Sequence, residues 1–160
     1  MEGYISEKMT FKQVSAPADL NTAAVTGARI QVSKGFRVAV ICSFGDSTAA
    51  VTSITMQQHT LASAGTTKVL ATSNPYFHKV AAATSFTKVE LSAAASVIAP
   101  TVLAADEGIY VFEILAEDLD RENGFDFFSI DVADSTAAKI MGAVYVLHDV
   151  RNVPAYELTV

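Results

Sequence analysis

The chain has 160 residues, of which 51% are hydrophobic and only 18% are charged, and its formal net charge is −6. This length predicts one domain with a substantial core. The acidic balance argues against a nucleic-acid-binding protein, because such a protein needs a basic face. Because few charges are available to cover the surface of a monomer, this composition favours a subunit that buries part of its surface against partners.

The first part of the chain, residues 1–27, differs from the rest. Its apolar side chains are scattered among charges without a clear period, and the Ala-Pro-Ala segment at 16–18 ends any regular element. It contains no hydrophobic core of a signal peptide. We expect an extended N-terminal arm over residues 1–27, with a first strand and loop of the main domain as the alternative. The candidate assembly contacts on this arm are Tyr4, Ile5, Met9, Phe11 and Val14.

From residue 28 onward, short apolar segments alternate with turns rich in Gly, Pro and Asp. Strands are predicted at 29–33, 36–44, 51–59, 68–70, 76–80, 86–91, 109–115, 125–132, 141–147 and 156–160. Segment 109–115 is apolar on both faces, which is typical of a central strand. One face of segment 36–44 carries Val38, Val40, Cys42 and Phe44.

Helices should be short or absent. The Ala-rich stretches at 93–105 and 134–141 are the helical candidates, and Pro100 with the β-branched residues around it limits the first of them. The pattern as a whole predicts an all-β fold, an antiparallel β-sandwich or jelly roll, with residues 28–160 as its single domain.

The pentapeptide Asp-Ser-Thr-Ala-Ala occurs at 46–50 and again at 134–138. The first copy follows a glycine, and Gly-Asp-Ser also surrounds the nucleophile of some serine hydrolases. Such an enzyme needs oxyanion donors and an aspartate three residues before its histidine. Before His148, that position holds Tyr145. We therefore interpret both copies as turns, in which Asp and Ser bond to local backbone groups, and expect no catalysis through Ser47 or Ser135.

No metal, cofactor or membrane site is predicted. The acidic run 117–124 lacks the spacing of an EF-hand loop and ends in the turn dipeptide Asn123-Gly124, so a solvated loop is expected, with a bound divalent ion as the alternative. His59 and His78 have no neighbouring ligands at zinc spacing. Cys42 lies in an apolar run and should be a buried thiol. The longest apolar stretch, 91–105, is too short to cross a bilayer.

Three segments carry a resemblance to a known protein family. They are APADLNTAAVTGARIQV at 16–32, NPYF at 74–77 and FEILAEDLDRENGFDFFSIDVADSTAAKIMGAVYVLHDVRNVPAYEL at 112–158. Together they are similar to small virion structural proteins of tailed bacteriophages, in particular to the capsid decoration (cement) type on the outside of the head. The resemblance covers most of the chain from about Ala16.

The resemblance implies a non-enzymatic, β-rich protein that forms oligomers, often homotrimers, on the lattice of the major capsid protein. It would be synthesised in the bacterial host cytoplasm and would lie on the capsid surface, where an acidic protein stays away from the packaged DNA. The arm would then reach onto a neighbouring subunit or the shell. The alternatives are a ring-forming tail or neck component and a carbohydrate-binding jelly roll for host attachment, which the absence of tryptophan disfavours.

Overall fold

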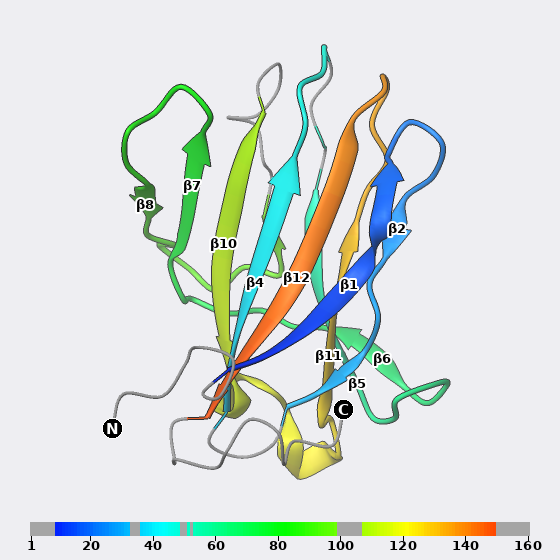
Figure 1. Cartoon of the computed structure of the whole chain (residues 1–160). Helices are drawn as coiled ribbons and strands as arrows, with labels where there is room; N and C mark the ends of the chain where they lie inside the picture. Colours follow the sequence, from blue (N-terminus) through cyan, green and yellow to red (C-terminus); the bar gives the residue numbers. More distant parts are fainter. Residues whose placement is uncertain (1–8, 33–35, 49–50, 52, 99–106, 150–160) are drawn as a thin grey trace.

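A computed structural model of the chain describes residues 9–32, 36–48, 51, 53–98 and 107–149. These residues form two antiparallel sheets, which we call sheet A and sheet B, packed face to face (Figure 1). The prediction of an all-β sandwich is confirmed. The helical segments among the described residues are two single turns of 3-10 helix, η2 (Ala116–Asp118) and η3 (Arg121–Asn123).

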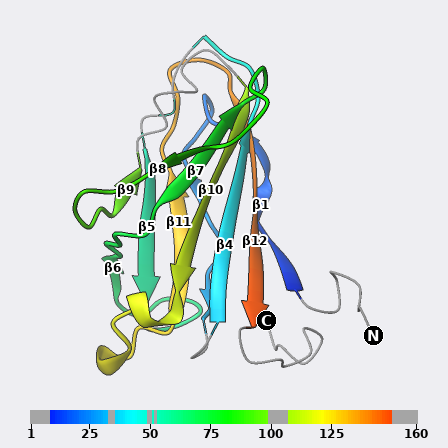
Figure 2. The same ribbon diagram turned by 90° about the vertical axis from the view of Figure 1, so that its left-hand side faces the viewer.

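Each sheet has six strands, and Figure 2 shows the two layers side by side. Sheet A has the order β1 (Met9–Asp19), β12 (Ile140–Asp149), β4 (Phe36–Phe44), β10 (Gly108–Leu115), β7 (Tyr76–Val80), β8 (Thr87–Val89). Sheet B has the order β2 (Val25–Thr26), β11 (Phe127–Val132), β5 (Ile54–His59), β6 (Thr67–Val69), while β3 (Ile30–Gln31) pairs with β11 and β9 (Val97–Ile98) with β5.

The strand order is that of a jelly roll. The chain crosses between the sheets from β3 to β4 to β5, and again from β10 to β11 to β12. Strands β1, β12, β4 and β10 form one layer, and strands β2/β3, β11, β5 and β6/β9 form the other. This is the double-sheet arrangement of a jelly roll. The β7–β8 hairpin extends sheet A beyond β10.

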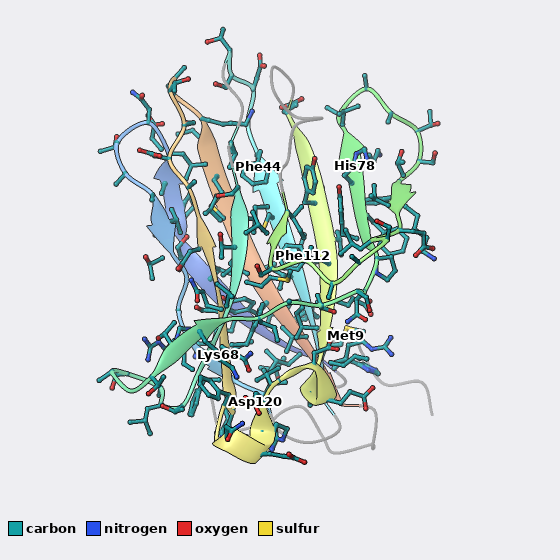
Figure 3. The ribbon with its side chains drawn as sticks, turned by 180° about the vertical axis from the view of Figure 1, so that it is seen from behind. Met9, Phe44, Lys68, His78, Phe112 and Asp120 are labelled. Carbon is teal, nitrogen blue, oxygen red and sulfur yellow. The ribbon has the colours of Figure 1, made fainter. Side chains whose placement is uncertain are left out.

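The core lies between the two sheets, because alternate residues of each strand point to opposite faces. Strand β10 lies between β4 and β7, and its Tyr110, Phe112 and Ile114 are buried. Figure 3 shows Phe44 and Phe112 between the layers. The prediction that 109–115 is a central strand is therefore confirmed. The predicted inner face of β4 is also confirmed, with exposures of at most 2% at Val38, Val40, Cys42 and Phe44.

The expectation of an N-terminal arm is wrong for residues 9–26, which belong to the sandwich. Strand β1 pairs with β12, beginning with Met9 opposite His148, and β2 pairs with β11. Val14 is 1% exposed and lies in the same core as the rest of the chain. Its carbonyl oxygen accepts a hydrogen bond of 2.7 Å from the Ala28 amide. The structure instead agrees with the alternative, in which this segment forms a first strand and loop of the main domain.

Strand β1 escapes detection in the sequence because its pairing is irregular. Register shifts occur between Gln13 and Ser15 and between Ser15 and Ala18, and each shift breaks the period of two that marks a strand. Pro17 is tolerated because β1 is an edge strand, and one side of an edge strand needs no ladder hydrogen bonds.

The two Asp-Ser-Thr-Ala-Ala segments are connections between the sheets. One follows β4 and the other follows β11, and Val51, just after the first, forms an antiparallel bridge with Ser135 in the second. The Ser135 hydroxyl donates to the Ala137 carbonyl at 2.6 Å, and the Asp46 carboxylate accepts from the Ser47 amide at 2.8 Å. These local bonds agree with the interpretation of both copies as turns.

The other predicted elements are mostly present. Eight of the ten predicted strands overlap β4 to β8 or β10 to β12, while 29–33 is reduced to β3 and 156–160 lies outside the described residues. Neither helical candidate is a helix where the structure describes it: β9 occupies part of 93–98, and 134–139 leads into β12. Small alanine side chains permit a helix, but their β-branched neighbours favour strands, and in the jelly roll these segments serve as a short strand and a connection.

Candidate interaction surface

The outer face of sheet A is apolar along its centre. The register of the strands aligns side chains from different parts of the chain into rows, with neighbours about 5 Å apart. The first row has four apolar side chains, Phe77, Val111, Ile41 and Val144, and it ends at Lys88 of β8 and at Gln13 of β1. The second contains Ala39, Val146 and Phe11 and begins with Glu113 of β10. We define the sheet A face as Phe11, Ala39, Ile41, Phe77, Ile109, Val111, Val144 and Val146.

No described strand layer covers this face, which is turned toward the viewer in Figure 1. Phe11 is 54% exposed, and Ile41, Val111 and Val144 are half-buried by their neighbours in the sheet. Val146 is buried within the row. A sheet with apolar residues on both sides is typical of a sheet that is covered on both sides, so the sheet A face is a candidate for contact with another molecule.

The outer face of sheet B has the opposite character. Its outward positions alternate with the core residues of β5 and β11. Five of the six are polar: Thr55, Gln57, His59, Ser129 and Asp131, with Phe127 as the sixth. Polar outward positions are usual for an antiparallel sheet with one solvated face, although His59 and Ser129 are themselves buried. The contrast between the two outer faces identifies sheet A as the side that is suited to a partner.

Lys79 borders the sheet A face beside Ile109, and further charges lie at the opposite end of the face, where they partly cancel. Arg37 on β4 forms an ion pair of 3.2 Å with Glu113 on β10, and Lys88 on β8 pairs with Glu90. A pocket of about 320 Å³ lies at this end. Its volume is near the lower limit of about 300 Å³ for small-molecule sites. The pocket is lined by Arg37, Asn74, Pro75, Phe77, Lys88, Glu113 and Leu115.

The predicted assembly contacts fall into three groups. Met9 and Phe11 lie on the outer side of sheet A, opposite His148 and Val146 of β12. Val14 is a core residue and is not available to a partner. Tyr4 and Ile5 lie outside the described residues. The larger part of the sheet A face was not predicted from the sequence, although Ile41 on the second face of segment 36–44 and Ile109 and Val111 on that of segment 109–115 were a signal for it.

The structure separates the residues that a hydrolase would need to bring together. Ser135 precedes the start of β12, and His148 lies at the other end of that strand. Eight residues of extended chain from Ile140 to His148 span roughly 26 Å. Ser47 is on the side of Ser135, because Val51 pairs with Ser135. Neither serine can therefore use His148 as a general base in this conformation.

A serine and a histidine that the sequence analysis did not connect are in contact. On sheet B, His59 Nε2 lies 2.8 Å from the Ser129 hydroxyl, and His59 Nδ1 lies 2.7 Å from the Thr67 hydroxyl. The Arg29 guanidinium donates to the Leu61 carbonyl at 3.0 Å, and also to the carbonyl of Ala64 and the hydroxyl of Thr67. Arg29 thereby joins the segment before β3 to the β5–β6 hairpin.

This cluster is closed to substrates. Ser129 is 1% exposed and His59 is 4% exposed. Burial, and after it the charge of Arg29, lowers the pKa of His59 to about 4. A neutral histidine that bonds two hydroxyl groups is a structural element of sheet B. His59 and Ser129 are 70 positions apart in the chain, and no local motif relates them.

The acidic loop 117–124 is held by internal donors. The Asp118 carboxylate accepts from the Leu115 amide and from the Asn74 side chain, each at 2.8 Å. Asp120 pairs with Lys68, as Figure 3 shows, and also accepts from Asn123. Gly124 has a φ of 79°, which glycine adopts readily. The predicted turn between two strands is thus present, and the two aspartates already have protein partners.

The described residues include no group of three or more His, Cys, Asp or Glu side chains that could hold a metal ion. His59, on the outer side of sheet B, and His78 are both buried. Cys42 is a buried free thiol, as predicted, and burial raises its pKa to about 12. Among the described helices, none is long and apolar enough to cross a membrane.

Comparisons with known proteins give little further information. No protein-family model matches the chain, and no curated protein matches it. One match among solved structures is titled "Structure of infectious bursal disease virus Gx strain", with 13% sequence identity and a TM-score of 0.28. The match covers 93% of this chain but 31% of that one, so this chain spans about a third of its length. Likeness at this level carries no argument about family or function.

Proposed function

We propose that the protein is a non-enzymatic virion structural protein of a tailed bacteriophage, a decoration protein that lies on the outer capsid surface. In this proposal it is made in the bacterial host cytoplasm, needs no cofactor, and assembles with the major capsid protein and with copies of itself. The phage and its capsid are named on the basis of the resemblance stated above, which also implies that three copies of the chain form a homotrimer.

The observation that carries the proposal is the sheet A face. A jelly roll that functions alone needs only one apolar side per sheet, whereas sheet A also has an apolar centre on its outer side. A decoration protein acts by bridging neighbouring shell subunits, so that opening the shell also requires separation of the buried interfaces. Such a role needs apolar surface and structural rigidity, and it needs no reactive side chain.

The absence of an enzymatic role is supported by the arrangement of the reactive groups. Among the described residues, the serine in contact with a histidine is almost fully buried. The two serines of the repeated turns are on the far side of the molecule from His148. The acidic side chains of the 117–124 loop are bonded to neighbouring donors.

The test is binding to emptied heads of the cognate phage. Purified protein should cosediment with heads that lack it, saturate at a fixed ratio to the shell protein, and raise the temperature at which the heads break open. Isolated tails and necks from the same phage are the matched control. Binding to tails or necks in place of heads would indicate the tail or neck alternative, and binding to neither would contradict the proposal.

A further inference from the structure

The turn dipeptide Asn123-Gly124 is exposed in the connection between β10 and β11. We infer that Asn123 is a deamidation site, and that the hydrogen bonds from its side chain to Asp120 hold this site closed while the protein is folded. This modification is independent of the proposed function.

An asparagine that is followed by glycine can convert itself to an acidic residue. The glycine amide nitrogen loses its proton to solvent and attacks the side-chain amide carbon of the asparagine. The new C–N bond closes a succinimide ring, and the side-chain nitrogen takes up a proton from solvent and leaves as ammonia. Water then opens the ring and leaves aspartate or isoaspartate. Glycine favours this reaction because it has no Cβ to obstruct the ring. The chain has this dipeptide once, at 123–124, whereas its other asparagines precede Thr22, Pro75 and Val153.

The turn keeps the two reacting groups apart. Asn123 is the last residue of η3, and its Nδ2 donates to the two carboxylate oxygens of Asp120 at 2.8 and 2.9 Å. Residues three apart lie above one another in a 3-10 helix, so this side chain turns back toward Asp120 and away from the residue that follows it. The Gly124 amide donates to the Arg121 carbonyl at 3.0 Å. Ring closure therefore requires these hydrogen bonds to break first.

Asp120 is itself fixed to sheet B. Its carboxylate pairs with Lys68 of β6, as the two labelled side chains in Figure 3 show, and its backbone amide donates to the Gln58 side chain of β5 at 2.8 Å. The Lys68 ammonium also lies 4.5 Å from the centre of the Phe125 ring. Because Asp120 is tied to two strands, it stays in place as the acceptor for Asn123.

Deamidation would open this contact permanently. A carboxylate at position 123 would replace the amide donor that now lies 2.8 and 2.9 Å from the Asp120 oxygens, and two carboxylates so close together repel one another. An isoaspartate would in addition lengthen the backbone before Gly124, whose φ of 79° closes the turn. The β10–β11 connection would then lose the hydrogen bonds between its two ends.

The first test compares the folded and the unfolded chain. Purified wild type is incubated at mildly alkaline pH with and without denaturing guanidinium chloride, and its peptides are examined by mass spectrometry and by an isoaspartate assay. We expect Asn123 to deamidate at least about tenfold more slowly in the folded protein, since one hydrogen bond to a charged group corresponds to roughly this factor.

The second test removes the acceptor. Asp120→Ala should speed up the deamidation of Asn123 in the folded protein by at least about tenfold. Glu122→Ala is the matched control, because it also removes a carboxylate from this turn, whereas the Asn123 amide donates to Asp120. The control should deamidate at the rate of the wild type.

Hydrogen exchange shows whether the sandwich stays folded in these variants. The Tyr110 amide, on the strand between β4 and β7, should remain slow to exchange. If Asp120→Ala loses this protection, Asp120→Ser replaces it, because serine keeps a polar residue before η3 but offers one acceptor oxygen in place of two. Wild type that deamidates as fast when folded as when unfolded overturns the inference. A folded Asp120 variant that deamidates no faster than Glu122→Ala also overturns it.

Discussion

Acidification should destabilise the protein through one residue, His59. The ring of His59 is 4% exposed and lies between the hydroxyl groups of Ser129 and Thr67. Burial and the nearby Arg29 charge lower its pKa to about 4 from the ordinary value of 6.5. In the unfolded chain the ring regains its ordinary pKa, so that between these two values the unfolded state binds more protons than the folded state.

The sign and the size of the effect follow from this difference. The contribution of His59 to stability is fully present above about pH 6.5 and declines as the pH falls toward 4. The loss amounts to about 2 kcal/mol at pH 5 and to about 3 kcal/mol below pH 4. Asp131, on the same face, has the opposite effect: burial raises its pKa, so the folded state gains relative stability as the pH falls through that raised value.

The assay is urea unfolding, followed by circular dichroism, at about pH 5 and about pH 7.5 for the wild type and for His59→Gln. Asp131 is present in both proteins, so its contribution cancels in the comparison. The free energy of unfolding of the wild type should drop between the two pH values by about 2 kcal/mol more than that of the variant. His148→Gln, at the end of β12, is the matched control. An equal pH dependence in the wild type and His59→Gln would refute the reasoning.

Three further predictions concern the core. Gly27→Ala should lower the free energy of unfolding by about 2 kcal/mol or more, because an added Cβ would lie 2.6 Å from the Ile130 carbonyl oxygen; unfolding at the wild-type urea concentration would contradict the packing. Val14→Ala should lower the free energy of unfolding by about 2 kcal/mol. Phe11→Ala, on the opposite side of β1, should lower it by less than about 0.5 kcal/mol in the isolated protomer. Equal losses for the two variants in urea unfolding would contradict the register of β1. The buried Cys42 thiol, with its pKa raised to about 12, should react with an aromatic disulfide reagent only as the protein unfolds, and rapid labelling of the folded protein would contradict its burial.

The sequence by itself determined the strands that have a regular period. In β4 and β10 apolar residues recur at every second position, and this local pattern is enough to predict both the strand and its inward face. Turn dipeptides such as Asn123-Gly124 depend on only two neighbouring residues, so these turns could also be predicted from the sequence. The all-β class follows from these local signals, because no stretch of the chain combines helical period with sufficient length.

The tertiary structure alone decided the role of the first strand. Residues 9–19 have no clear period, since two register shifts interrupt the alternation. Their strand conformation comes from pairing with β12, more than 120 positions away. The candidate contacts predicted for this segment were thereby divided: Val14 faces the core, while Phe11 remains on the outer side.

The same limit applies to the surface that we propose as functional. Each strand of sheet A contributes only a few outward apolar side chains, and in the sequence they look like ordinary members of an apolar run. The register of β1, β12, β4, β10 and β7 places them in adjacent rows. The sequence therefore determined which segments are strands, whereas only the pairing of distant strands decided that the apolar side chains of their second faces lie side by side.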